Sequence, residues 1–95
     1  MAAPTVLVID DDKLTRWLVS RILGRAGYQV REAASAKEGL RAIADRRPEA
    51  VLLDVVLPDL DGFAVLRTIR RDFPGLPVIL ITAHASGEPL RAARE

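Results

Sequence analysis

Four runs of aliphatic residues alternate along the chain with segments of helical spacing, and this alternation constrains the fold more than any other feature. Three of the runs, 5–9, 50–53 and 78–81, consist of β-branched and aliphatic residues, which is typical of strands buried on both faces of a parallel sheet. The fourth run, 28–33, alternates apolar with polar residues and favours an edge strand. The pattern therefore predicts an α/β fold with right-handed crossovers and helices on both faces of the sheet.

The segments between the runs have the spacing of amphipathic helices. One face of a helix predicted over 13–26 carries Leu14, Leu18, Ile22 and Leu23, and Gly27 supplies the stop of this helix. This apolar face is expected to pack on the sheet.

Two further helices follow the second and third runs, and a short one follows the fourth. Ser35 is predicted to be the N-cap of the second helix, with Glu38 as its capping-box partner. Apolar residues at helical spacing within 63–69 indicate the third helix. A short final helix is predicted to open in 86–89, where a proline suits the first turn.

Composition fits one globular domain spanning 1–95 and excludes several classes of protein. A net charge of +1 gives no overall bias toward nucleic acid or membrane. The sequence has no Cys, which excludes disulfides and thiolate chemistry. No apolar run approaches the length of a membrane span, and the first residues lack a signal-peptide pattern. A soluble cytoplasmic domain is expected.

Three acidic residues and one threonine directly follow predicted strands. Asp10 and Asp11 follow the first strand, Asp54 follows the third, and Thr82 follows the fourth. The carboxyl ends of parallel strands meet at one edge of an open sheet, where ligands bind. The fold is therefore expected to gather these side chains in one pocket.

Carboxylates gathered in this way repel one another unless a cation joins them. Mg²⁺ is the predicted ion because it prefers oxygen ligands, with Asp11 and Asp54 as direct ligands and Asp10 acting through water. A carboxylate beside such an ion can attack phosphorus and form an aspartyl phosphate. Thr82 could donate its hydroxyl to a phosphoryl oxygen. The competing interpretation of Asp10 and Asp11 is that they cap the first helix.

Three motifs in this order resemble those of response-regulator receiver domains. They are Val8-Ile9-Asp10-Asp11-Asp12, the segment from Asp54 to Gly62 with its D-x-x-x-P-x-x-D-G pattern, and Ile81-Thr82-Ala83. The middle motif, at the end of an apolar strand, is the most discriminating. The resemblance covers the whole chain and implies a flavodoxin-like, doubly wound parallel sheet of strand order 2-1-3-4.

The resemblance also implies roles for particular residues. Asp54 would be the phospho-acceptor, Asp10 and Asp11 the acidic pair, and the backbone carbonyl of Val56 a third protein ligand to Mg²⁺. Thr82 would be the hydroxyl that turns toward the phosphoryl group. The implied partner is a sensor histidine kinase or a phosphotransfer protein, docking on the arginine-containing first helix. Such a module is not itself an enzyme.

Two other functions remain open from the sequence. One is a protein-interaction module of the same fold that is impaired in phosphorylation. The other is a phosphatase of the haloacid dehalogenase type, which also uses an Asp nucleophile but expects a second Asp two residues later. That position is Val56, which argues against the phosphatase.

The sequence also departs from the family pattern at its C-terminal end. The family's fifth strand and fifth helix, with a lysine that pairs with the phosphoryl group, would follow Glu95. The chain is therefore expected to be an incomplete receiver without an output domain, and without direct binding to nucleic acid. Strand 78–81 would then be an open edge, which predicts a homodimer through this strand or the terminal helix.

Overall fold

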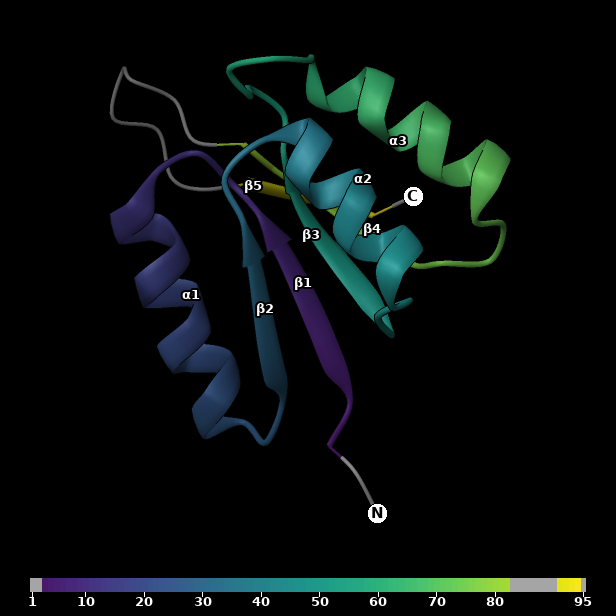
Figure 1. Ribbon diagram of the computed structural model, residues 1–95. Coiled ribbons are helices and arrows are strands. Elements are labelled where there is room, and N and C mark those ends of the chain that lie inside the picture. Colours follow the sequence, from purple (N-terminus) through teal and green to yellow (C-terminus); the bar gives the residue numbers. More distant parts are fainter. Residues whose placement is uncertain (1–2, 83–90, 95) are drawn as a thin grey trace.

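The computed structural model describes residues 3–82 and 91–94, which form one sheet with helices against it (Figure 1). The strands are β1 (Thr5–Ile9), β2 (Gln29–Ala33), β3 (Ala50–Asp54), β4 (Val78–Thr82) and β5 (Arg91–Arg94). The helices of the described residues are α1 (Lys13–Arg25), α2 (Ala36–Asp45) and α3 (Gly62–Asp72).

The sheet has the order β2-β1-β3-β4-β5, and its first four strands are parallel. The predicted order 2-1-3-4 and the α/β class are confirmed. Chain order and spatial order diverge at β1, since β2 lies on one side of it and β3 on the other. The crossover through α1 runs from β1 to β2, and the crossover through α2 runs in the opposite direction, from β2 past β1 to β3. Because both are right-handed, α1 and α2 lie on opposite faces of the sheet. Figure 1 accordingly shows α1 by itself beside β2, and α2 and α3 together at the other side.

The hydrophobic core lies between the sheet and the pair α2 and α3. Alternate residues of the three central strands are fully or almost fully buried there, namely Leu7, Ile9, Val51, Leu53, Val78 and Leu80. The helices contribute Ile43, Val65 and Ile69, of which none is more than 1% exposed. Continuous apolar strands and one apolar stripe per helix are therefore enough to account for this layer.

Both predicted helix boundaries at α1 and α2 are confirmed. Gly27 has φ 97°, and its amide donates to the carbonyl of Gly24 at 3.1 Å while Tyr28 donates to Leu23 at 3.0 Å. This pair of bonds is a Schellman motif, which favours glycine at the left-handed residue after the helix. At the start of α2, the Ser35 hydroxyl accepts from the amide of Glu38 at 3.2 Å.

The apolar face of α1 does not pack as predicted. Leu14, Leu18 and Ile22 are 67%, 51% and 62% exposed. Leu23 is half-buried, and no residue of α1, every one of which is described, is fully buried. Trp17 lies 52% exposed, with the Arg21 guanidinium 5.0 Å from its ring centre. The helical spacing was correct, but spacing alone does not say whether a neighbouring element covers the face.

The prediction of a final helix is wrong where it can be compared. Residues 91–94 form β5, which pairs antiparallel with β4, so that Thr82 faces Arg91 and Ile79 faces Arg94. Residues 83–90 lie outside the described part of the chain. An unpaired edge leaves backbone groups without partners, and pairing them outweighs the helix propensity of an Ala- and Arg-rich segment.

The expectation of an open β4 edge is wrong, because β5 pairs with this edge. β5 occupies the outer side of β4 over Ile79–Thr82, and it is antiparallel, unlike the parallel fifth strand expected of the family. The predicted homodimer loses the open edge that was the reason for it. Among the described residues, no helix has both the length and the apolar character needed to cross a membrane.

Candidate functional site

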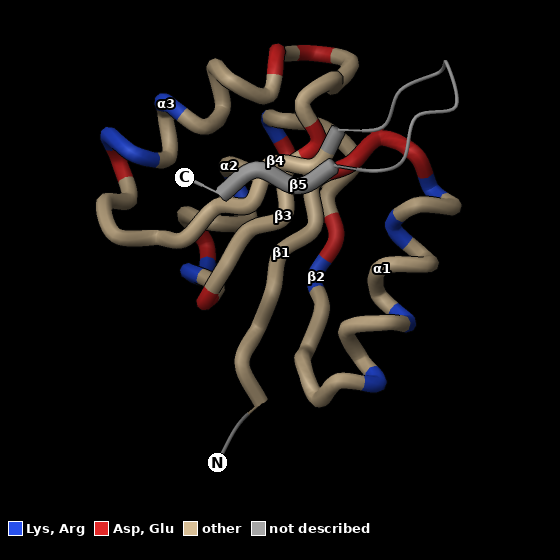
Figure 2. Tube along the Cα trace, turned by 180° about the vertical axis from the view of Figure 1, so that it is seen from behind, with Lys and Arg blue, Asp and Glu red and all other residues tan. Residues whose placement is uncertain are grey.

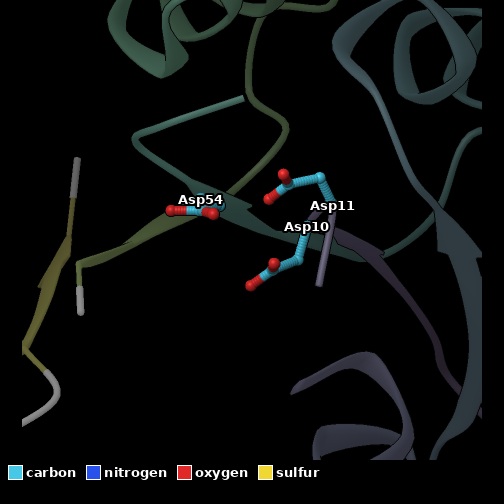
Figure 3. Close-up of side chains that lie close together, drawn as sticks. All are labelled: Asp10, Asp11 and Asp54. Atoms are coloured by element: carbon cyan, nitrogen blue, oxygen red, sulfur yellow. The ribbon is translucent and has the colours of Figure 1, made fainter. Parts of the chain in front are cut away.

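Three carboxylates meet at the carboxyl ends of β1 and β3. The two strands pair in parallel with Ile9 opposite Leu53, which places Asp10, the next residue, beside Asp54. Asp11 follows at once, and one oxygen of each carboxylate lies within 4.8 Å of the others. Figure 3 shows the side chains of Asp10 and Asp11 extending toward Asp54. The predicted gathering of these three carboxylates is therefore confirmed.

Burial and mutual repulsion make two of these carboxylates hard to ionise. Asp10 is 7% exposed, and burial together with the nearby charge of Asp54 raises its pKa to about 6. Burial, and then the charge of Asp11, raise the pKa of Asp54. Backbone amides oppose these shifts: Asp12 donates to Asp10 at 2.9 Å and Val56 donates to Asp54 at 3.2 Å. Such a pocket favours a cation.

The donor set suits a hard divalent ion. Three carboxylates from two strand ends offer oxygen ligands within a few ångströms of one another, as Mg²⁺ requires. Figure 2 shows the wider setting, in which acidic residues gather at this edge of the sheet and basic residues lie along α1. Val56 lies in the loop two residues beyond Asp54, and the role of its carbonyl as a ligand stays a prediction.

The start of α1 is capped by the residue that follows Asp10 and Asp11. Asp12 is the N-cap, and its carboxylate accepts from the amide of Thr15 at 3.2 Å and from the Thr15 hydroxyl. These bonds lower the pKa of Asp12. The structure therefore contradicts the alternative interpretation, in which Asp10 or Asp11 caps this helix.

A tight loop carries the chain from Asp54 to α3. Asp61 is the N-cap of α3 and accepts from the amide of Phe63 at 2.8 Å, while Val56 and Asp61 form an isolated antiparallel bridge. A side chain at Gly62 would meet the carbonyl oxygen of Asp54 at 2.5 Å. Glycine is needed here because the start of α3 lies directly against the backbone at the end of β3. Asp61 and Gly62 therefore shape the loop and the start of α3.

The sequence analysis missed two residues that hold the backbone around the site in place. Arg16 of α1 donates to the carbonyl oxygen of Asp10 at 2.7 Å and to Glu32 of β2 at 3.1 Å, so it fixes the backbone beneath the acidic pair. Asp59 accepts from the amides of Ala36 and Lys37, both at 2.9 Å. Both contacts join segments far apart in the chain, and a single sequence carries no signal for them.

The predicted switch residue is placed only by its backbone. Thr82 is the last residue of β4, one position beyond Ile81, the pairing partner of Asp54. Its strand thus ends at the same edge of the sheet as the carboxylates, and the role of its hydroxyl stays a prediction. Ala83 lies outside the described residues.

Comparison with known sequences gives one consistent answer. Residues 6–95 match the sequence profile of the response regulator receiver domain. The transcriptional regulatory protein AfsQ1 of Streptomyces coelicolor is 45% identical over 80 residues, which are 84% of this chain and 35% of AfsQ1. The chain thus spans about a third of the length of that relative.

Solved structures agree with this result. A CheY-like receiver domain protein of Methanospirillum hungatei has a TM-score of 0.83 at 34% identity, over 90% of this chain and 68% of its own. The response regulator TrrA of Thermotoga maritima, solved in complex with Mg²⁺-BeF, has a TM-score of 0.83 at 29% identity, over 87% of this chain and 72% of its own.

Proposed function

Because the chain belongs to the response regulator receiver domain family, we propose that it is a phospho-accepting module of a two-component phosphorelay, with Asp54 as the acceptor. The observation that carries the proposal is the cluster of Asp10, Asp11 and Asp54, whose oxygens lie within 4.8 Å of one another at the switch point of the sheet. A receiver of this family interacts with histidine kinases or phosphotransfer proteins.

Each residue of the cluster has a part in the proposed transfer. A carboxylate oxygen of Asp54 forms the new bond to phosphorus while the bond from phosphorus to the donor's imidazole nitrogen breaks. Asp10, Asp11, Asp54 and the Val56 carbonyl would hold Mg²⁺. When bound, Mg²⁺ neutralises the charge on the phosphoryl oxygens. Arg16 and the amide of Val56 hold the backbone and the Asp54 side chain in place before transfer.

The conformational change that follows phosphorylation is proposed to begin at the end of β4. The Thr82 hydroxyl, at the end of that strand, is proposed to turn toward the phosphoryl group and so change the surface around the strand's end. The chain is proposed to act in the cytoplasm, and not to be an enzyme in its own right. Any output on DNA would come from another region or a partner, as the name of AfsQ1 suggests for a longer regulator.

Two alternatives are set against this proposal. A receiver fold that no longer accepts phosphate would keep the acids as a binding surface only. An Asp-based phosphatase would need an acid or base two residues after Asp54, where Val56 stands with its side chain 74% exposed. The clustering of three carboxylates around Asp54 favours the acceptor over both.

The test is a calorimetric titration of beryllium fluoride into the protein in Mg²⁺, a probe chosen because TrrA was solved in complex with Mg²⁺-BeF. The wild type should bind it, and Asp54→Asn should not. Release of inorganic phosphate from acetyl phosphate separates the alternatives: steady turnover indicates a phosphatase, and neither binding nor release indicates an interaction module.

A further inference from the structure

The start of α2 is capped by two separate segments of the chain. Ala36 donates its amide to Asp59 Oδ1 and Lys37 donates to Asp59 Oδ2, both at 2.9 Å. Glu38 donates to the Ser35 hydroxyl at 3.2 Å. The first three amides of the helix therefore each have an acceptor, and Asp59 provides two of them from more than twenty residues farther along the chain.

Asp59 lies at the tip of the acceptor loop, residues 55–61, between Asp54 and α3. The base of this loop is closed, since Gly62 donates to the Val55 carbonyl at 2.7 Å and Val56 pairs with Asp61. The tip has only two attachments among the described contacts: Leu57, buried in the core at 9% exposed, and the carboxylate of Asp59.

The bond from Asp59 to α2 is charge-assisted. The amide groups at a helix N-terminus carry partial positive charge, which attracts a carboxylate. The amides of Lys37 and Ala36 lower the pKa of Asp59, so its side chain is ionised at neutral pH. Leu60 also donates to Asp59, at 3.1 Å, which orients the carboxylate within its own loop.

We infer that Asp59 is a positioning residue for the acceptor site. Its carboxylate fixes the tip of the acceptor loop against α2, and thereby holds the backbone of Val55 and Val56 next to Asp54. Val56 is the residue whose amide bonds to Asp54 and whose carbonyl is proposed as a Mg²⁺ ligand. The inference rests on the proposed function of this site, because positioning matters only if Asp54 and its neighbours bind an ion and accept phosphate.

The chain offers a matched set of variants. Asp59→Ala removes both acceptors. Asp59→Asn keeps one oxygen but turns an amino group toward a helix amide, so one bond is lost together with the charge. Ser35→Ala is the control: it removes a cap from the same helix end and leaves the acceptor loop untouched.

Two measurements on the full chain separate loop positioning from helix capping. The first is amide hydrogen exchange at Val56 and Gly62, whose amides bond within or beside the loop. The second is Mg²⁺ affinity by calorimetry. Asp59→Ala should speed exchange at both amides and weaken Mg²⁺ binding by about tenfold, the lower end of the effect of residues that orient metal ligands. Asp59→Asn should have exchange rates and a Mg²⁺ affinity between those of the wild type and Asp59→Ala. Ser35→Ala should match the wild type in exchange and in Mg²⁺ affinity but melt at a lower temperature.

The inference is overturned if Asp59→Ala matches the wild type in exchange and affinity, or if Ser35→Ala changes both as much as Asp59→Ala does. A wild type that binds neither Mg²⁺ nor beryllium fluoride would refute the proposed function instead. In that case hydrogen exchange alone decides the structural part: unchanged rates in Asp59→Ala refute it, and faster rates at Val56 and Gly62 support it.

Discussion

The two faces of the sheet are held in different ways. On the face covered by α2 and α3, side chains such as Ile69 and Val65 are fully buried against the strands. On the other face, α1 buries none of its described residues, and Leu14 and Ile22 are more than 60% exposed. Polar contacts help to attach α1: Glu32 of β2 accepts from Arg16 at 3.1 Å and from Ser20 at 3.1 Å, beside the half-buried side chains of Val19 and Leu23.

The acidic site lies where these two kinds of attachment meet. Asp54 and its loop are fixed from the packed face, through Gly62 and Asp59. Asp10 is fixed from the other face, through the bond from Arg16 to its carbonyl. Apolar burial is large and insensitive to salt, whereas exposed ion pairs contribute little and are screened. Stability is therefore expected to depend on one face, and the fine geometry of the site on both.

The contrast is tested most strongly by truncating one isoleucine on each face. Ile69→Ala should lower the free energy of unfolding by about 2–5 kcal/mol, because a fully buried side chain leaves a cavity. Ile22→Ala, at a position 62% exposed, should change it by no more than about 0.5 kcal/mol. Urea unfolding measures both, and equal losses would mean that α1 is covered in solution.

Two glycines give the next largest contrast. Gly62→Ala places a Cβ 2.5 Å from the carbonyl oxygen of Asp54, so it should destabilise by about 1–3 kcal/mol and weaken Mg²⁺ binding. Gly24→Ala, in α1 with nothing within 4 Å of the added atom, should stabilise by about 0.5–1 kcal/mol. Thermal and urea unfolding of both variants would measure these two changes in stability. A stable Gly62→Ala with wild-type Mg²⁺ affinity would contradict the description of the acceptor loop.

The acidic pocket should make stability depend on pH when divalent ions are removed with EDTA. The pKa of Asp10 rises from 3.8 to about 6 on folding, so between these values the folded protein holds a proton that the unfolded chain has lost. The free energy of unfolding should therefore fall as pH rises through this window, by about 1–2 kcal/mol after allowance for solvent screening.

Removal of the ionisable group supplies the control for this pH effect. Asp10→Asn should reduce the slope, and the part that remains is assigned to Asp54, whose pKa is also raised. Asp12 and Asp59 have lowered pKa values, so their contributions are lost only as pH falls below the ordinary value of 3.8, outside the window. A wild-type stability that is flat from about pH 4 to about pH 6 would refute the electrostatic description of the pocket.

The smallest expected effect concerns the polar attachment of α1. Glu32→Ala removes the acceptor for Arg16 and Ser20 and should cost about 0.5–1 kcal/mol, less in high salt. Amide hydrogen exchange within α1 should become faster, whereas exchange in α3 should not change. Asp72→Ala, which breaks the exposed pair with Arg71, serves as a control and should leave α1 exchange as in the wild type. Unchanged α1 exchange in Glu32→Ala would show that other contacts hold this helix.

Local patterns in the sequence were sufficient for most of the fold. The apolar runs, the Gly27 stop and the Ser35 cap are features of a few adjacent residues, and each is confirmed. The acidic cluster was predictable as well, because strand order brings the ends of β1 and β3 together.

Features that depend on distant partners were not predictable. Whether Leu18 is buried depends on a covering element, and helical spacing does not report its presence. The change of 91–94 from helix to strand depends on the free edge of β4, which outweighs local propensity. The bond from Asp59 to the start of α2 links two loops that no sequence motif connects.

The most direct test of the central claim is the intact mass of the protein after incubation with acetyl phosphate and Mg²⁺. The wild type should gain one phosphoryl group, the gain should disappear in EDTA, and Asp54→Asn should gain none under any condition. A wild type without an adduct, or an Asp54→Asn variant that gains the same mass, would contradict the assignment of Asp54 as the phospho-acceptor.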